Sequence, residues 1–260
     1  MSIRLEGGSR EATDALITPP LVSIITVVFN ARSVLPELLE SVLKLKNPYI
    51  ELIVVDGGSN DGTFEFLQQH DSSIEYWLSE PDYGIYDAMN KAIAHARGTF
   101  LLHLNAGDEL LTVPVEELLR AEEEGLDIVA FRVSLDGMSE FRPSYNMTLR
   151  FNNTLHHQGT FFRREIFPAY DIAYKVFADF DVNQRLLRAG ARASISDTVV
   201  ALHATDGVSN QPTAAADTEF FQIVAKNYGR RSLPVAWAMC KWRGFMARLR
   251  PLGVNRRSSI

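Results

Sequence analysis

The stretch from Thr99 to Asp108 (TFLLHLNAGD) is an apolar run that ends abruptly in Asn, two small residues and a carboxylate. A run this dense in Leu and Phe is typical of a buried central strand. In open α/β sheets ligands bind at the carboxyl ends of the strands, so Asp108 would be held on a rigid element and face a crevice. Taken alone, the ending is better explained as an ordinary turn, because Asn, Gly and Asp are common turn residues.

Two further polar clusters, Val28 to Asn30 and Asp56 to Ser59, also follow apolar runs. Parallel topology would bring both clusters and the Asp108 cluster to one edge of the sheet. Converging carboxylates repel one another unless a cation or hydrogen-bond donors neutralise them. A divalent cation that holds a diphosphate is the simplest explanation. Because Mg²⁺ or Mn²⁺ usually takes only one or two protein carboxylates, Asp108 would suffice.

The first 108 residues alternate between apolar, β-branched runs and helical patterns with one apolar face. Such alternation predicts an α/β fold with a doubly wound, mostly parallel sheet and helices on both faces. The predicted strands are 21–29, 50–55, 74–78 and one that starts at 99, and the predicted helices are 33–46, 61–69 and 84–97.

Beyond Asp108 the alternation is less regular. Asp136-Gly137 favours a hairpin turn, and 142–158 shows no clear periodicity, as is common in segments that line a site. The remaining predicted strands are 127–134, 159–162 and one within 191–202, and the remaining predicted helices are 115–124, 179–189, 213–228 and 232–248.

The composition indicates a globular protein in a reducing compartment. Over 260 residues, 46% hydrophobic and 22% charged are ordinary values. The single cysteine, Cys240, excludes an internal disulfide, and neither a Cys cluster nor an HExxH spacing indicates a zinc site. Residues 1–19 lack the apolar core of a signal peptide or membrane anchor, so we expect a mobile tail and a cytoplasmic protein.

The charges are unevenly distributed along the chain. No acidic residue follows Glu219, whereas nine of the 26 Lys and Arg residues do. The acidic body argues against nucleic acid as a partner, because phosphate backbones bind basic faces. The predicted helix 232–248 combines Trp237 and Trp242 with basic residues, a composition typical of helices that lie on anionic membranes without spanning them. Packing on the acidic body, or a contact between subunits, would explain the same pattern.

The chain resembles the inverting glycosyltransferases of family 2, which have the GT-A fold. The matching segments are SIITVVFN, IELIVVDGGSNDGT, EPDYGIYDAMNKAI, the strand ending LNAGD and ADFDVNQRLLRAG, in the family's order. The Asn-Ala-Gly-Asp ending and the upstream Asp-Ala-Met-Asn-Lys are similar to those of the branch that builds bacterial surface polysaccharides of the colanic acid type. The resemblance implies transfer of a sugar from a nucleotide-diphosphate sugar to a hydroxyl of a glycan or lipid-linked acceptor.

The resemblance also implies how the chain is divided. A catalytic domain would span 20–210, with a donor half (20–108) and an acceptor half (109–210), followed by a basic helical extension over 211–260. The residues implied to bind the nucleotide-sugar are Val28, Asn30, Asp56, Asp82, Gly84, Asn90, Lys91 and Asn105.

Asp179 falls where the family places its general base, which removes a proton from the acceptor hydroxyl. An alternative is that Asp179 is only the N-cap of its helix. His157 and Gln158 would line the acceptor side. Asp108 would bind Mn²⁺ or Mg²⁺, and His203 would be either a further metal ligand or a structural histidine.

The chain departs from the family at several positions. Asn105 and Gly107 stand where carboxylates are common, and Ala178 stands where a Glu precedes the base. A catalytically degenerate GT-A module that binds ligands or acts as a scaffold is therefore an alternative. An S-adenosylmethionine-dependent methyltransferase fits less well, because the Gly-rich loop at 54–62 follows the second strand rather than the first.

Overall fold

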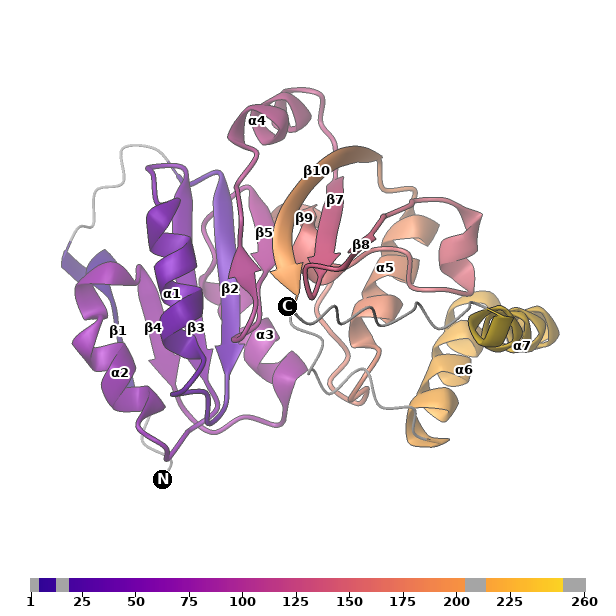
Figure 1. The fold of residues 1–260 in the computed structure, drawn as a ribbon, viewed down its shortest axis with the longest axis horizontal. Helices are drawn as coiled ribbons and strands as arrows, with labels where there is room; N and C mark the ends of the chain where they lie inside the picture. Colours follow the sequence, from indigo (N-terminus) through magenta and orange to yellow (C-terminus); the bar gives the residue numbers. More distant parts are fainter. Residues whose placement is uncertain (1–4, 13–18, 204–213, 250–260) are drawn as a thin grey trace, which may run out of the picture.

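The computed structural model describes residues 5–12, 19–203 and 214–249, and these fold around a ten-stranded sheet (Figure 1). The strand order is β1-β4-β3-β2-β5-β9-β7-β10-β6, with β8 paired to β7. The strands are β1 (Leu5–Gly7), β2 (Val22–Val28), β3 (Ile50–Asp56), β4 (Tyr76–Ser79), β5 (Phe100–His103), β6 (Glu109–Leu110), β7 (Ile128–Leu135), β8 (Ser139–Phe141), β9 (Thr160–Arg163) and β10 (Ala193–His203).

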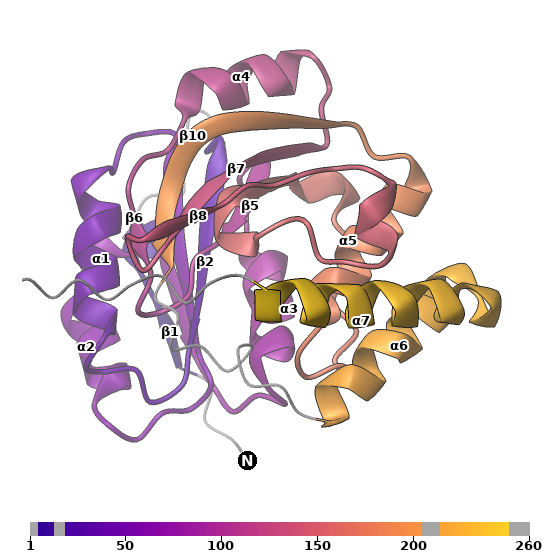
Figure 2. The ribbon, with the colours of Figure 1, turned by 45° about the vertical axis from the view of Figure 1, so that its right-hand side comes forward.

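The helices cover both faces of the sheet. They are α1 (Leu35–Lys44), α2 (Thr63–Gln69), α3 (Ile85–His95), α4 (Val115–Glu123), α5 (Ala178–Ala189), α6 (Ala214–Tyr228) and α7 (Leu233–Leu249). One apolar core joins the sheet to α1, α2 and α4, and a second core joins it to α3, α5 and α6 (Figure 2). Because successive strand residues point to opposite faces, Ile24 packs in the first core and Ile25 in the second. The predicted fold class is therefore confirmed.

The first half of the sheet is regular. β2 pairs in parallel with β3 and with β5, and β3 pairs in parallel with β4. All seven residues of β2 and all seven of β3 are buried, which explains why both strands are mostly apolar. The carboxyl ends of these strands consequently lie along one edge.

The second half of the sheet is mixed, and this brings three segments to the same edge. β9 runs antiparallel to β5, so the 3-10 turn before it, His157–Gly159, lies at the carboxyl end of β5. β10 runs parallel to β7 and antiparallel to β6, with Leu202 opposite Glu109. His203 and Asp108 are therefore neighbours, although 95 residues separate them.

Two local predictions have different outcomes. The hairpin turn at Asp136-Gly137 is confirmed, since both residues have positive φ (49° and 66°) between the paired strands β7 and β8. The mobile tail is wrong for residues 5–12, because β1 pairs with β4 and a 3-10 turn follows at Ser9–Ala12. Arg10 forms an ion pair with Glu51, a carboxylate that is 2% exposed, and this pair holds the segment on the sheet.

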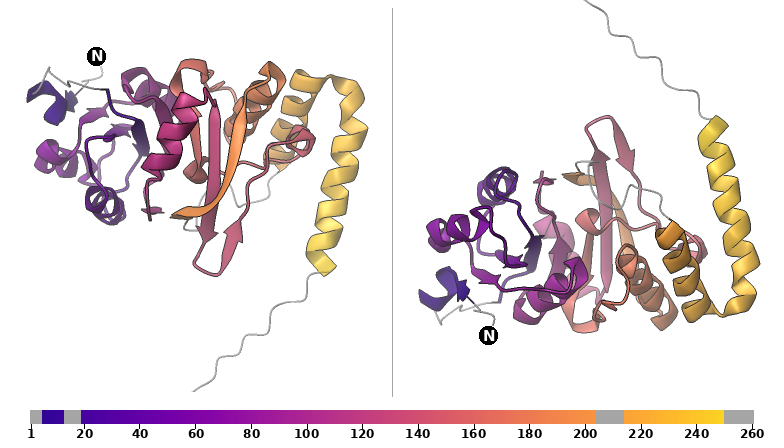
Figure 3. Two further views of the ribbon diagram at one scale, coloured as in Figure 1. Left: turned by 90° about the horizontal axis from the view of Figure 1, so that it is seen from above. Right: turned by 90° about the horizontal axis from the view of Figure 1, so that it is seen from below.

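The C-terminal helices form the end of the molecule beyond α5. α6 packs on α5, and α7 packs on α6 along the outer edge (Figure 3). The predicted helices 213–228 and 232–248 match α6 and α7 closely. Among the described residues, no helix is both long and apolar enough to cross a membrane.

Candidate functional site

Asp108 lies in the short loop between β5 and β6, at the carboxyl edge of the sheet. Its side chain is almost completely buried, and the backbone N–H of Asn105 donates to its Oδ2 at 3.2 Å. Gly107 has φ of 95°, a backbone conformation that residues other than glycine rarely adopt, so a glycine lets the loop turn back at this point. The loop thus fixes the carboxylate where the sequence predicts it, facing residues from the other half of the sheet.

Two side chains from the second half of the sheet contact Asp108. Gln158 Nε2 donates to Oδ2 at 2.7 Å, and His203 Nδ1 lies 2.9 Å from Oδ1. Gln158 is fully buried, yet its Oε1 atom has no hydrogen-bond partner. Unsatisfied buried oxygens are uncommon in folded proteins, and this one lies on the side chain that touches Asp108.

Asn105, His157 and Asp179 form a second branch of the same network. Asn105 Nδ2 is 3.0 Å from His157 Nε2, and His157 Nδ1 is 3.9 Å from Asp179 Oδ2. Asn153 Nδ2 donates to Asp179 Oδ2 at 2.8 Å, and Asn183 Nδ2 donates to Asn153 Oδ1 at 2.9 Å. The structure therefore joins the predicted strand-end, acceptor-side and base residues in one cluster.

Asp179 is the second residue of α5. The N-cap of this helix is Phe177, with no side-chain cap, so the alternative in which Asp179 is the N-cap is wrong. Burial raises the pKa of Asp179, while His157 and the amide of Asn153 act in the opposite direction. Burial lowers the pKa of His157, against the attraction of Asp179 and Asp108. The pair consists of a carboxylate with raised proton affinity beside an imidazole that favours its neutral form.

The segment before Asp179 is held by a residue that sequence reasoning missed. Glu219 of α6 accepts hydrogen bonds from the backbone N–H groups of Lys175, Val176 and Phe177 at 2.8, 2.9 and 2.5 Å. Tyr86 donates its hydroxyl to the carbonyl of Val176 at 2.7 Å. The sequence offered one signal, since Glu219 is the last acidic residue of the chain and every charged residue after it is a Lys or an Arg.

Asp56 differs from Asp108 in its surroundings. It is fully buried at the end of β3, in register with Val28, and it accepts hydrogen bonds from Ser79 Oγ at 2.6 Å and from both the N–H and the hydroxyl of Ser59. Asn30 has φ of 50° and accepts from the N–H of Asn60 at 3.1 Å. The loops after β2 and β3 are thereby tied together. Phe29, which sequence reasoning did not select, is 67% exposed between them.

The other predicted donor residues divide into two pairs. Asp82 accepts from the N–H of Gly84 at 2.8 Å, and a Cβ on Gly57 would lie 2.5 Å from Asp82 Oδ2, so this loop approaches the Asp56 loop closely. Asn90 instead exchanges two hydrogen bonds with the backbone of Tyr170, at 2.9 and 2.8 Å. Lys91 forms ion pairs with Glu80 at 2.9 Å and with Asp87 at 3.5 Å, and it donates a hydrogen bond to the carbonyl of Pro81 at 2.9 Å. The structure does not bring Asn90 or Lys91 to the cluster.

The cluster suits a divalent cation that has few protein ligands. Among residues 5–12, 19–203 and 214–249, no group of three or more His, Cys, Asp or Glu side chains could hold a metal by itself. Asp108 and His203 supply one carboxylate and one imidazole in contact, and the unpartnered Gln158 Oε1 adds a neutral oxygen nearby. Carboxylate, amide oxygen and imidazole are donors that Mn²⁺ accepts, and diphosphate oxygens commonly complete such a site.

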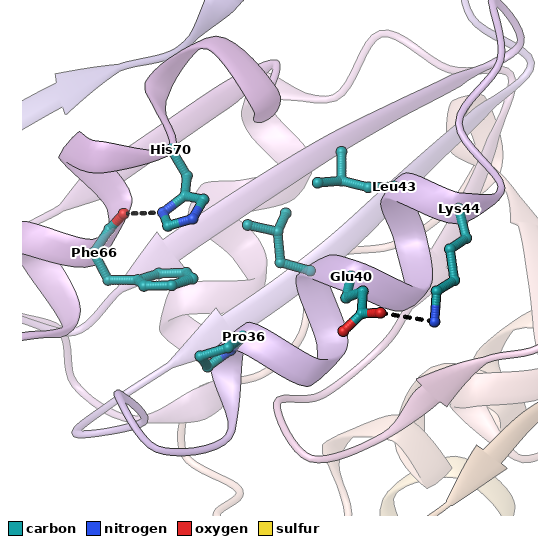
Figure 4. Close-up of a pocket in the computed structure, with 7 residues that line it drawn as sticks. Pro36, Glu40, Leu43, Lys44, Phe66 and His70 are labelled. Atoms are coloured by element: carbon teal, nitrogen blue, oxygen red, sulfur yellow. Dashed lines mark hydrogen bonds and ion pairs between the residues drawn. The ribbon is translucent and has the colours of Figure 1, made fainter.

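A separate cavity of about 480 Å³ lies between α1 and α2, and its lining contains none of the predicted site residues. Figure 4 shows Phe66 and His70 on one wall and Pro36 and Leu43 on the other. The ring of His70 is already bonded to the carbonyl of Phe66 at 2.8 Å. The wall is mainly apolar, so we do not associate this cavity with the charged cluster at the sheet edge.

Comparison with known proteins identifies the fold and the family. The model of glycosyl transferase family 2 matches residues 23–183. The PGL/p-HBAD biosynthesis glycosyltransferase of Mycobacterium bovis is 34% identical over 178 residues, which are 64% of this chain and 69% of that protein. The putative teichuronic acid biosynthesis glycosyltransferase TuaG of Bacillus subtilis is 39% identical over 35% of this chain and 37% of its own.

Solved structures share the architecture at low sequence identity. Staphylococcus aureus TarS 1-349 in complex with UDP-GlcNAc has a TM-score of 0.65 and 17% identity over 79% of this chain and 66% of that chain. A mannosyltransferase from Pyrobaculum calidifontis, in complex with GDP-Man and Mn²⁺, has a TM-score of 0.58 and 16% identity over 90% of this chain and 82% of that chain. The match covers only 43% of the longer TarS chain. These likenesses show the GT-A fold.

Proposed function

The chain belongs to glycosyl transferase family 2, and on that premise we propose that it is an inverting glycosyltransferase with Asp179 as its general base. The observation that carries this proposal is the polar cluster in which hydrogen bonds join Asp108 to Gln158 and His203, and Asn105 to His157, with Asp179 3.9 Å from His157. Residues from four distant parts of the chain meet there. This arrangement supports the proposal of a base and a cation site at one edge of the sheet.

The proposed reaction is one in-line displacement. Asp179 takes the proton of the acceptor hydroxyl while that oxygen forms a bond to the anomeric carbon of the donor sugar. The bond between the anomeric carbon and the diphosphate oxygen breaks, and the electron pair leaves with the diphosphate. Attack from the opposite side inverts the anomeric carbon. The raised pKa of Asp179 suits the role, because a stronger base accepts the proton more readily.

We assign the divalent cation to Asp108 and His203, with Gln158 Oε1 beside them. Mn²⁺ or Mg²⁺ bound there would neutralise negative charge on the departing diphosphate. His157 would separate this charged site from Asp179 and orient the carboxylate. Asn153 would hold the other side of Asp179 through its hydrogen bond at 2.8 Å.

The donor is proposed to be a nucleotide-diphosphate sugar. Both solved neighbours are complexes with compounds of this class, UDP-GlcNAc and GDP-Man. The loops at Asn30, Asp56 and Asp82 would form the nucleotide pocket, and the exposed ring of Phe29 offers a flat surface on which a base could stack.

The acceptor is proposed to be a glycan or a lipid-linked glycan used in cell-surface polysaccharide synthesis. Support comes from the names of the relatives, which refer to PGL/p-HBAD and teichuronic acid biosynthesis. We place the reaction in the cytoplasm, at the inner membrane surface where a lipid-linked acceptor would be found.

Donor turnover by Asp179→Asn tests the proposal. The purified protein is incubated with UDP- and GDP-sugars and Mn²⁺, and the released nucleoside diphosphate is measured with and without acceptor glycans. We expect Asp179→Asn to lower turnover about 10²- to 10⁴-fold, as for loss of a general base, while donor affinity is retained. Asp197→Asn is the matched control, since the side chain of Asp197 is 87% exposed on β10.

Two results would contradict the enzyme proposal. Equal losses of binding and turnover in Asp179→Asn would make Asp179 a structural residue. Binding of a nucleotide-sugar without turnover in the wild type would favour the scaffold alternative. That alternative is suggested by Gly107 and Ala178, which stand where carboxylates are common in the family.

A further inference from the structure

The outer face of α7 has an unusual composition for a surface that meets only water. Trp237 is 57% exposed, Trp242 is 64% exposed and Val235 is 49% exposed. The neighbouring Lys241 is also exposed, and its Nζ lies 5.5 Å from the centre of the Trp237 ring. Ala236 is fully buried on the opposite side of the helix, where α7 meets α6. One face of α7 therefore anchors the helix, and the other presents two tryptophans.

The described charged residues in the turn that leads into α7, and at the neighbouring end of α5, are basic. Arg230 and Arg231 are exposed in the turn between α6 and α7, and Arg188 is exposed at the end of α5, beside Tyr228 of α6. In the sequence no acidic residue follows Glu219, and Arg243, Arg248, Arg250, Arg256 and Arg257 continue the basic composition. An acidic protein surface would complement the charge but would not require tryptophans. Exposed Trp beside Lys and Arg is the composition of a helix at the interface of an anionic bilayer.

We propose that the outer face of α7, defined by Val235, Trp237, Lys241 and Trp242, docks on a membrane that contains anionic phospholipids. The indole rings would insert at the headgroup level, and Lys241 with the arginines of the α6–α7 turn would meet the lipid phosphates. Each basic residue near such a surface strengthens binding about fivefold, and the gain falls as salt screens it. This inference deepens the proposed function, because a lipid-linked acceptor would be presented at that surface.

The contacts of α6 connect this surface to the proposed base. α7 packs on α6, and Glu219 of α6 holds the backbone of 175–177 directly before Asp179. Lys226 and Asn227 of α6 also contact Asp181 of α5, at 3.7 and 2.9 Å. A membrane bound by α7 would therefore lie one helix away from the element that carries Asp179.

Vesicle binding tests the proposal on the full chain without donor or acceptor. The protein is sedimented with vesicles of phosphatidylcholine alone or with about one third phosphatidylglycerol, in low and in high salt. We expect binding to the anionic vesicles only, with release at high salt. Trp237→Ala combined with Trp242→Ala should weaken binding at least tenfold, and Lys241→Glu should weaken it about fivefold or more. Lys44→Glu is the charge control, because Lys44 is 68% exposed on α1.

Tryptophan fluorescence gives a second, independent measurement. The chain has three tryptophans, and Trp77 is buried in the first core, so a shift of emission to shorter wavelength on adding anionic vesicles would report Trp237 and Trp242. Trp237→Phe with Trp242→Phe should remove the shift while the far-ultraviolet circular dichroism stays unchanged.

Three results would overturn the proposal. The first is equal recovery of the protein in the supernatant with both vesicle types, and the second is vesicle binding that the tryptophan substitutions leave unchanged. The third is a protein that does not bind vesicles but forms concentration-dependent dimers, which the tryptophan substitutions abolish. The last result would assign the face to a second copy of the chain. Loss of turnover in the donor assay would not affect these measurements, so failures of the two proposals can be distinguished.

Discussion

The proposed donor half (20–108) and the proposed acceptor half (109–210) place their polar side chains in different ways. In the donor half, Asp56 accepts its hydrogen bonds from Ser59 and Ser79, residues of its own loop and of the adjacent strand. Asp108, at the end of the donor half, and Asp179, in the acceptor half, depend on partners 26 to 95 residues away along the chain. The first arrangement follows from the parallel pairing of β2, β3 and β4. The second depends on β9, which runs antiparallel to β5, and on β10, which pairs with β6 next to Asp108.

This difference shows where function is sensitive to distant parts of the chain. A local loop keeps its shape as long as its strand is intact. A cluster built from long-range contacts changes when any supporting element moves, and α6 is one such element, although it contributes no residue to the cluster itself. Buried charges in the two halves should therefore serve different purposes, and substitutions can test this.

The largest expected effect is on stability, at Glu51 of the donor half. Glu51 is 2% exposed and accepts from Arg10, Ser23 and the backbone N–H groups of Arg97 and Gly98. Glu51→Ala would leave the Arg10 guanidinium, which is 10% exposed, without its partner. We expect the free energy of unfolding to fall by about 3–5 kcal/mol, measured by urea denaturation.

Two controls accompany this measurement. Glu51→Gln keeps an acceptor oxygen for the N–H groups and should cost less than Glu51→Ala. Glu40→Ala removes a carboxylate that is 68% exposed and should change stability by less than about 1 kcal/mol. If the folded fraction of Glu51→Ala lost donor turnover as well, the separation of roles between the two halves would be wrong.

The next effect is on donor binding, at Asp108. Asp108→Asn keeps the shape of the side chain but removes its charge, so Mn²⁺ should no longer strengthen binding of UDP or GDP. We expect a loss of about 100-fold in metal-stimulated affinity, the upper end of what changes around metal ligands produce. Calorimetry with and without Mn²⁺ measures it, and Glu109→Gln, at the exposed neighbouring position, is the control. Unchanged Mn²⁺ dependence in Asp108→Asn would refute the assignment.

The sequence predicts the strands and helices between residues 20 and 108 closely, but it predicts the contacts of the candidate site only in part. Buried parallel strands such as β2 have mostly apolar sequences, so their positions along the chain could be predicted from local signals. Contacts such as Asn153 with Asp179, or Glu219 with 175–177, depend on how distant elements pack, and no local pattern encodes them. The pairing of β1 with β4 was missed for the same reason, because a three-residue edge strand has too short a pattern to be distinguished from a tail.

A smaller effect should appear at Glu219, which supports the site without belonging to it. Glu219→Ala removes the acceptor of three backbone N–H groups directly before α5. We expect kcat to fall about 10- to 100-fold with little change in donor affinity, because small displacements of a catalytic group are costly. Steady-state kinetics and donor titration measure the two quantities.

Asp217→Asn is the matched control for Glu219, since it lies two residues away on the exposed face of α6. Glu219→Gln keeps one acceptor oxygen and should retain more activity than Glu219→Ala. A donor affinity that falls in parallel with kcat would indicate general misfolding rather than displacement of Asp179.

The smallest effect should be a change of pH dependence at Asn153. Asp179 can act as a base only when deprotonated, so activity should rise with pH through its pKa, which burial raises above the ordinary aspartate value. The Asn153 amide donates to the charged form at 2.8 Å and so lowers this pKa. In Asn153→Ala the charged form loses that donor, the pKa of Asp179 rises further, and the acid limb of kcat/KM should move to higher pH.

The loss of activity in Asn153→Ala should be about tenfold or less at acid pH and smaller at alkaline pH, where both proteins carry a deprotonated Asp179. Asn152→Ala provides a neighbouring control. If Asn153→Ala lowered activity equally at every pH, Asn153 would contribute only to packing, and the base would have to be sought elsewhere in the cluster.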